Sequence, residues 1–123
     1  MKCVRVYAGA DGQSHFADIE IPLNLLELPG LPPVWVSARH KTTSVQFVTV
    51  PAEIREPGWH NSREPFVGIW LNGETEIETS DGEIRRIPPG TPILAEDTWG
   101  KGHTSRHPPE EQNLIIIPVP EGL

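Results

Sequence analysis

The sequence contains one cysteine, Cys3, and no long apolar run. A lone thiol excludes an internal disulfide and a thiol-rich metal site, and its position beside a strand start favours a small buried hydrophobe over a nucleophile. No apolar stretch is long enough for the hydrophobic region of a signal peptide or for a membrane span. We therefore expect a soluble, cytoplasmic protein that makes no membrane contact.

Basic residues are scarce as well. The chain has 10 Lys and Arg against 17 Asp and Glu, which gives a formal net charge of −7. A nucleic-acid surface needs clustered Lys and Arg to neutralise phosphates, and the Arg85-Arg86 pair is too short to supply one. The composition therefore argues against a nucleic-acid partner.

Convincing helical periodicity is missing, while proline and glycine together account for 25 of the 123 residues. With 37% apolar residues and short segments throughout, this pattern favours a loop-rich, all-β architecture. The length suits one domain with one core, and no boundary is visible inside it. We expect a single β-barrel domain over residues 1–123, with N-terminal strands in residues 1–33 covering the barrel.

Residues 59–103 are the segment around which the rest of the chain is organised. Inside it, acidic residues alternate with β-branched ones at a period of two, which predicts a strand with one charged and one buried face. These alternating residues are Glu74, Thr75, Glu76, Ile77, Glu78 and Thr79.

The Asp-Gly pair at 81–82 predicts a two-residue type I′ hairpin after this strand. In that register Glu78 lies opposite Arg85, and an outward ion pair fits. Arg86 then falls on the inner face with Ile84, and we expect the twist of a strand that ends at a Pro-Pro-Gly sequence to turn its side chain outward.

Residues 25–33 are apolar but carry three prolines and a glycine, so they predict an ordered covering loop. The segment 66–71 is apolar on both faces, which predicts cover by the barrel interior on one side and by a second sheet or a second subunit on the other. The last apolar strand, 114–117, is a liability unless it is paired, and a homodimer is the economical expectation. Further strands are expected at 4–8, 15–23, 34–36, 44–50 and 93–95.

The sequence resembles the cupin superfamily in the order of its features. These are a His-bearing strand, a Gly-ended strand, a DGE hairpin, a Pro-x-Gly stop and a later histidine. One group of small single-domain cupins, of unassigned activity, is similar to this chain in three further segments. These are the opening GADGQSHFADIEIPL, the WHN and the AEDTWGKGH sequences. The superfamily likeness covers about residues 34–119 and implies a double-stranded β-helix, or jelly-roll, barrel.

The resemblance also implies a divalent metal ion such as Zn, Fe, Mn or Ni, held by two His and a Glu of a first motif and a His of a second. Two of these four ligands are present, and a catalytic site usually takes at least three protein ligands. A third ligand is available from Glu64 or from His40. The four implied ligand positions fall on His60, Ser62, Phe66 and His103.

His60 and His103 are the candidate catalytic residues, because a cupin-like barrel would bring them together at its open mouth. Without a metal they remain a proton-transfer pair, since imidazole titrates near neutral pH. Asp97 and Glu96 are candidates to orient them, although Asp and Thr side chains in this loop also cap turns.

Four further residues are candidates for ligand binding. Gly68 leaves room beside the histidines, and inward-facing Phe66 and Trp70 would line the same cavity, although core packing predicts these positions too. The glycines on either side of Lys101 allow a mobile lid or a close approach to an anionic ligand, and a solvated loop explains them equally well.

Three hypotheses about function stay open. The first is a barrel that binds a small molecule, in the form of a metal-assisted isomerase, lyase or dioxygenase-like enzyme that uses His60 and His103. The second is a metal-free binding or sensing module in which Phe66 fills the missing ligand position. The third is a structural protein whose barrel interior is packed with side chains.

Overall fold

The computed structural model describes residues 1–54 and 57–123, none of which lies in a helix, and this confirms the all-β prediction. The described chain therefore contains no helix that is long and apolar enough to span a membrane. In chain order the strands are β1 (Lys2–Ala8), β2 (Ser14–Glu20), β3 (Asn24–Leu26), β4 (Val34–Val36), β5 (Gln46–Val50), β6 (Phe66–Trp70), β7 (Thr75–Thr79), β8 (Ile84–Ile87), β9 (Ile93–Glu96), β10 (His103–Arg106) and β11 (Gln112–Pro118).

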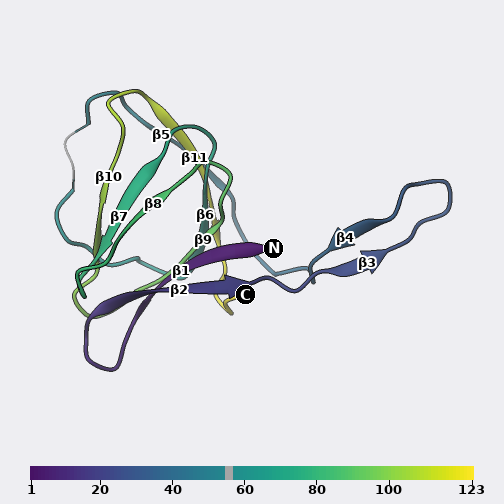
Figure 1. The fold of residues 1–123 in the computed structure, drawn as a ribbon, viewed down its shortest axis with the longest axis horizontal. Helices are drawn as coiled ribbons and strands as arrows, with labels where there is room; N and C mark the ends of the chain where they lie inside the picture. The colour runs from purple at the N-terminus through teal and green to yellow at the C-terminus, as the bar shows by residue number, and fades with distance from the viewer. Residues whose placement is uncertain (55–56) are drawn as a thin grey trace.

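Two sheets form the body of the molecule (Figure 1). The larger has six strands in the order β2-β1-β9-β6-β11-β5, and the smaller has three in the order β10-β7-β8. The β1–β9 pair is parallel, and the other strand pairs of the described chain are antiparallel. Among the described residues, strand pairing does not close the sheets into the predicted barrel, and the arrangement is that of a β-sandwich.

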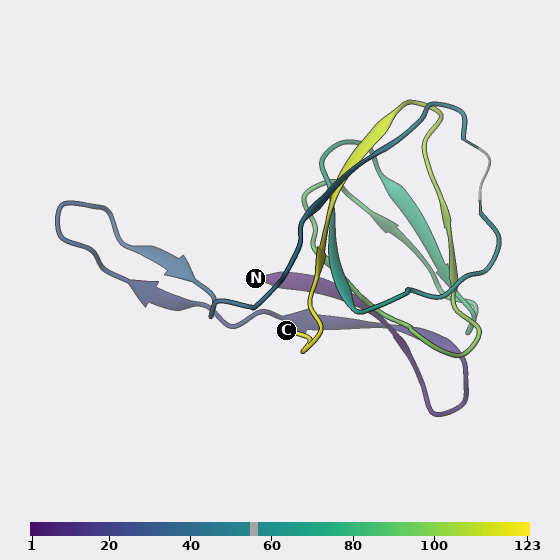
Figure 2. The same cartoon turned by 180° about the vertical axis from the view of Figure 1, so that it is seen from behind.

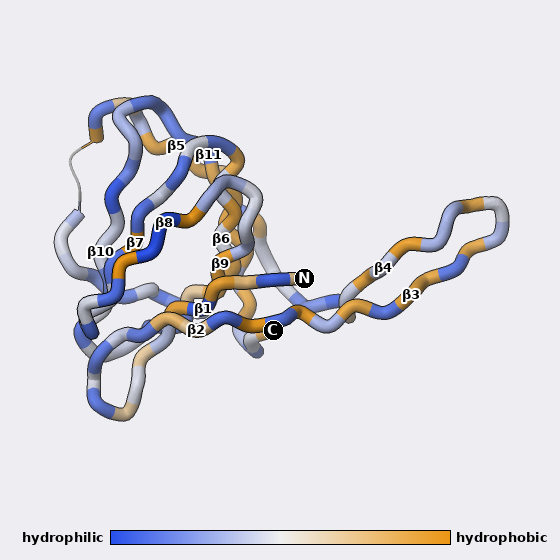
Figure 3. Tube along the Cα trace, viewed as in Figure 1, coloured by the Kyte–Doolittle hydropathy of each residue, from blue (hydrophilic) through white to orange (hydrophobic). Residues whose placement is uncertain are grey.

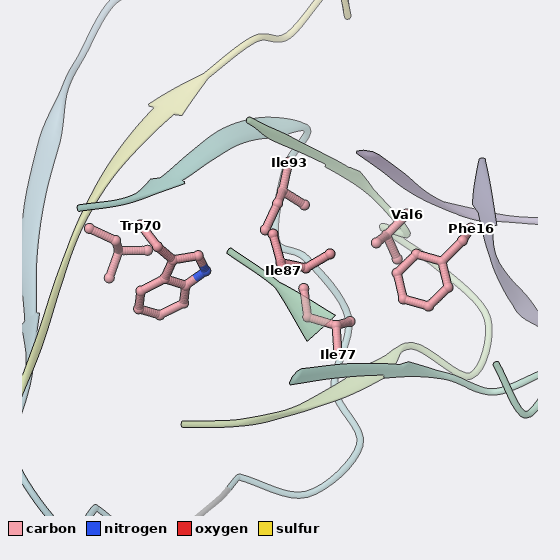
Figure 4. Packing of buried hydrophobic residues seen from close by; sticks show 7 residues of the cluster. Val6, Phe16, Trp70, Ile77, Ile87 and Ile93 are labelled. Carbon is pink, nitrogen blue, oxygen red and sulfur yellow. The ribbon is translucent and has the colours of Figure 1, made fainter. Parts of the chain in front are cut away.

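The hydrophobic core lies between the two sheets, where apolar side chains from both layers point toward one another (Figure 4). On β7 the predicted alternation is confirmed, because Thr75, Ile77 and Thr79 are buried while the intervening glutamates are partly exposed. The core consists of Val6, Phe16, Trp70, Ile77, Ile87, Ile93 and Leu114.

The β7–β8 hairpin has a register one residue away from the predicted one. Glu78 lies opposite Ile84, and its carboxylate pairs with Arg106 at 3.0 Å, so the predicted pair of Glu78 with Arg85 is wrong. The loop is one residue longer than a type I′ turn, and within residues 80–82 the positive φ belongs to Gly82 (98°). Because side chains alternate between faces, this shift exchanges the two faces of β8.

The shifted register explains both arginines of β8. Arg86 points outward, as predicted, within 3.7 Å of Glu76, whereas Ile84, which was expected on the inner face, is 52% exposed. Arg85 takes the inner side at the sheet edge, where its guanidinium lies 4.8 Å from the centroid of the Phe16 ring.

β11 is an interior strand, paired with β6 on one side and with β5 on the other. This apolar strand is therefore paired within the chain, and the argument for a homodimer from an unpaired strand does not hold. β6 has the two apolar faces that its sequence predicts. Phe66, Gly68 and Trp70 face the smaller sheet, while Val67 and Ile69 belong to a second apolar cluster on the outer face.

Residues 24–36 leave the body of the molecule as a two-stranded arm. Its strands β3 and β4 pair with each other, with Leu25 opposite Trp35, and the arm extends beyond both sheets (Figures 1 and 2). Its apolar side chains are exposed and do not lie over the core. Its structure therefore differs from the covering loop expected for residues 25–33. Both chain termini lie near the base of the arm (Figure 1).

Candidate functional site

A cavity of about 250 Å³ lies between the two sheets. Most of its wall is apolar and comes from the inner faces of β1, β6, β7, β9 and β11. The structure places five of the predicted site residues around it, on three different segments of the chain: His60, Phe66, Gly68, Trp70 and His103. The same wall includes one histidine that the sequence analysis did not single out, His107.

His60 and His103 meet at one end of this cavity. Their backbones form an isolated antiparallel bridge with hydrogen bonds of 3.0 and 2.9 Å, and their ring centroids are 4.7 Å apart. Both rings, with Phe66, also border an open depression of about 280 Å³, so the pair stands between the cavity and the surface. This is the mouth position that the sequence analysis expected for the two imidazoles.

Gly102 makes this close approach possible. Its φ is +73°, and a Cβ atom at this position would collide with the backbone carbonyl of His60. The other glycine of the loop, Gly100, packs in the same way against the carbonyl of Gly12, and the amide of Lys101 donates to that same carbonyl at 3.0 Å. The glycines around Lys101 thus serve tight backbone packing.

A buried carboxylate holds the ring of His103. The side chain of Asp97 is fully buried, and its Oδ2 lies 2.5 Å from His103 Nδ1. The hydroxyl of Ser62 donates to Asp97 Oδ1 at 2.8 Å, and the backbone amide of Ser62 donates to the Asp97 carbonyl. Two neighbours in the chain, Asn61 and Ser62, therefore fix the loop that presents the carboxylate to the imidazole.

These contacts determine which nitrogen of each ring is available to a ligand. Asp97 Oδ2 can accept but not donate, so His103 Nδ1 carries the hydrogen of their bond. His60 Nδ1 likewise donates to the Gly58 carbonyl at 2.8 Å. In the neutral rings Nε2 is then a hydrogen-bond acceptor on both histidines.

His107 is the third imidazole of the cavity wall. Its Nδ1 donates to Oε1 of the fully buried Gln112 at 2.9 Å, and its ring lies 5.1 Å from that of Trp70. Gln112 is itself held by the Asn72 carbonyl at 3.1 Å. The same acceptor-to-Nδ1 pattern therefore occurs at all three histidines of the cavity.

Glu64, Lys101 and His40 lie outside this cavity. Glu64 is exposed and borders the open depression beside His60. Lys101 lies on a different surface with Trp59 and Ser80, and His40 lines depressions beside the C-terminal residues. Of the proposed metal ligands, the structure thus brings together the two histidines.

A divalent metal does not fit the side chains that the structure describes. Across residues 1–54 and 57–123, no three His, Cys, Asp or Glu side chains lie close enough together to hold an ion. The Nδ1 atoms of His60 and His103 are hydrogen-bonded to protein acceptors, which leaves the two Nε2 atoms available to coordinate a metal ion. We therefore derive the chemistry of the site from its own side chains.

The sequence identifies the histidine pair but only part of the set of residues that support it. It named Asp97 and Glu96 together, and the structure separates them: Asp97 holds His103, whereas Glu96 pairs with Arg5 at 2.7 Å on the outer face. His107 directly follows β10 and lines the same cavity as His103, so a period of two counted from His103 would have pointed to it.

The fold and the site together define an all-β sandwich with a histidine-lined interior cavity. No family model and no curated protein matches the chain. Among solved structures, the crystal structure of protein NMB1881 from Neisseria meningitidis is similar at 17% identity with a TM-score of 0.45, over 80% of this chain and 82% of that one. A likeness of this extent carries no conclusion about function.

Proposed function

We propose that this protein is a small cupin-like jelly roll that binds one small, largely apolar molecule between its sheets and exchanges a proton with it through His103. The observation that carries the proposal is the Asp97–His103–His60 arrangement at the end of the cavity. A buried carboxylate behind an imidazole fixes its tautomer and stabilises the imidazolium that forms when Nε2 takes a proton.

The size of the cavity supports a ligand with a single ring. A dry apolar cavity of about 150 Å³ is enough for benzene, so about 250 Å³ leaves room for a ring with short substituents. This space also favours a binding role over a fully packed, purely structural interior.

The polarity of the wall points to the functional group that the ligand presents. Among residues 1–54 and 57–123 no Lys or Arg lines the cavity, and the carboxylate of Asp97 lies directly behind its His103 wall, so burying an anion there is costly. His60 and His103 instead offer Nε2 acceptors. A weakly acidic hydroxyl, such as a phenol or an enol, matches them because it donates a hydrogen bond and then yields its proton.

The experiment is NMR of the imidazole nitrogens in ¹⁵N-histidine-labelled protein, titrated with phenol, toluene and benzoate. We expect phenol to shift the Nε2 signals of His60 and His103, toluene to bind without that shift, and benzoate to bind at least about 10-fold more weakly than phenol. His103→Gln should remove the phenol shift. His40→Gln is the matched control, because His40 lies outside the cavity.

Two outcomes would contradict the proposal. If none of the three probes perturbs the cavity histidines, the cavity is not the binding site. If protein purified without a tag contains a stoichiometric metal and loses phenol binding on chelation, the metal-assisted enzyme replaces the metal-free site proposed above.

A further inference from the structure

The β3–β4 arm is an apolar element that no other described part of the chain covers. Residues 24–36 contain a single charged side chain, Glu27, whereas 27 of the 123 residues of the chain are charged. Hydrophobic positions run along both of its strands, as the orange segments of Figure 3 show. The exposed fractions are 48% for Leu25, 38% for Leu26, 48% for Leu28, 63% for Leu31, 49% for Val34, 66% for Trp35 and 37% for Val36.

Apolar side chains lie on both faces of the arm. Leu25 and Trp35 are opposite each other on one face, and Leu26 and Val34 are opposite each other on the other. An isolated two-stranded hairpin is at best marginally stable in water, and exposed apolar strands promote association. The arm therefore requires a surface that buries it.

The outer face of the six-stranded sheet offers such a surface. The strand registers place Phe47, Ile115 and Ile69 in one row across β5, β11 and β6. A second row, Ile117 and Val67, runs beside it. Phe47 is 77% exposed, and both isoleucines of the first row are partly exposed.

We propose that two copies of the chain form a symmetric dimer by exchanging arms, the arm of each lying across the Phe47–Ile115–Ile69 row of the other. In its own chain the arm begins after β2, at the opposite edge of the sheet from β5, and extends away from the body (Figures 1 and 2). A second copy supplies a face for each arm and an arm for each face, which is the reciprocity of a two-fold interface.

Charge restricts the contact to these surfaces. Two copies with a formal net charge of −7 repel each other, so association is favoured where acidic side chains are few. The arm has one acidic residue, Glu27, and the Phe47–Ile115–Ile69 row has none.

The available area matches that of a stable interface. Fully exposed, a large apolar side chain presents on the order of 150 Å². Seven arm residues and Phe47, which are between 37% and 77% exposed, therefore offer roughly 600–700 Å² per subunit. A standard interface buries about 800 Å² per partner, a value that neighbouring backbone and rim atoms would complete.

The first test measures molar mass by light scattering during size-exclusion chromatography of the full chain. We expect about 27 kDa, twice the 13.6 kDa of one chain. Trp35→Asp and Phe47→Asp should each raise the dimer dissociation constant by about 100-fold or more, since each change occurs twice in the dimer and aromatic anchors cost about 30-fold or more apiece. Ile84→Asp is the matched control, because Ile84 is 52% exposed on the smaller sheet.

The second test mixes the two variants. A mixed dimer of Trp35→Asp and Phe47→Asp has one intact arm on one intact face, so mixing should restore part of the dimer that each variant alone has lost. Packing of the two sheet faces on each other without arms would give no such recovery. Circular dichroism and urea unfolding of each variant verify that its monomer is folded.

Three results would overturn the proposal: a monomeric wild-type chain at 50–100 µM, on the order of typical chromatographic loads; a dimer that survives Trp35→Asp; or failure of the mixture to recover. Sedimentation of the wild-type chain with phosphatidylcholine vesicles, lost in Trp35→Asp, would identify a lipid surface as the occupant of the arm instead.

Discussion

Replacing Asp97 by alanine tests whether this carboxylate supports the histidine pair. The change removes the acceptor of two donors, buried Ser62 Oγ and largely buried His103 Nδ1. Each buried donor left without an acceptor costs about 1–3 kcal/mol. The variant no longer has to bury a charged carboxylate, which offsets part of this cost, so we expect the free energy of unfolding to fall by about 3–4 kcal/mol. With an unfolding entropy of about 0.26 kcal/mol/K for a chain of this length, the Tm should fall by about 12–15 °C.

Urea unfolding followed by circular dichroism measures this loss. The matched control is Glu96→Ala at the adjacent position, where a partly exposed pair with Arg5 contributes about 0–1 kcal/mol. Asp97→Asn should cost less than alanine, because the amide oxygen can accept from His103 while its nitrogen donates to Ser62. A loss below 1 kcal/mol in Asp97→Ala would refute the assignment of Asp97 as the residue that holds the ring.

Two further predictions concern the surroundings of the site. Gly102→Ala should destabilise the protein by at least about 2 kcal/mol in urea unfolding, because the added Cβ atom would collide with the His60 carbonyl. Gly12→Ala is the control: Gly12 has a similar φ of +79° but open space around it, so this change should cost about 1 kcal/mol. Equal losses in the two variants would argue against the collision. The hydrogen bond with Asp11, together with that to Asp81, raises the pKa of His15 above 6.5. Its stabilising contribution is therefore complete below pH 6.5 and lost as pH rises through the folded pKa, so the gap in urea midpoint between wild type and His15→Gln should be larger at pH 6 than at pH 9. A constant gap would contradict this coupling.

The sequence predicts the core strands well because their periodicity is strong. In β7 charged and β-branched residues alternate without exception, and the burial of Thr75, Ile77 and Thr79 follows directly. The register of the next strand was predicted wrongly because it depends on the length of the turn. The Asp-Gly pair fits both a two-residue turn and a longer loop with glycine in the left-handed region, and the structure has the longer one.

The arm could not be predicted from composition. Apolar residues between prolines usually cover a core, so residues 25–33 looked like a covering loop. The pairing of Leu25 with Trp35 is instead local, and whether a hairpin lies over the body or projects from it is decided by tertiary packing, which the local sequence does not encode.

The candidate site, like the fold, could be predicted from the sequence only in part. His60 and His103 lie close together, as predicted, with their ring centroids 4.7 Å apart. The choice of Asp97 over Glu96 depends on which of two adjacent side chains faces inward, since neighbours on a strand or its extension alternate between faces. With the strand bounds uncertain by a residue or two, sequence alone does not decide between them.

Two side chains beside the histidine pair, Ser62 and Phe66, account for the chemistry we propose. Ser62 donates to the carboxylate that holds His103. Phe66 adds a ring to the apolar cavity wall. Ser62 thereby secures the imidazole that we propose as the proton acceptor, and Phe66 lowers the polarity around it, which strengthens the hydrogen bond that His103 Nε2 offers a ligand. Both side chains therefore favour proton exchange with a weakly acidic ligand over coordination of a metal ion.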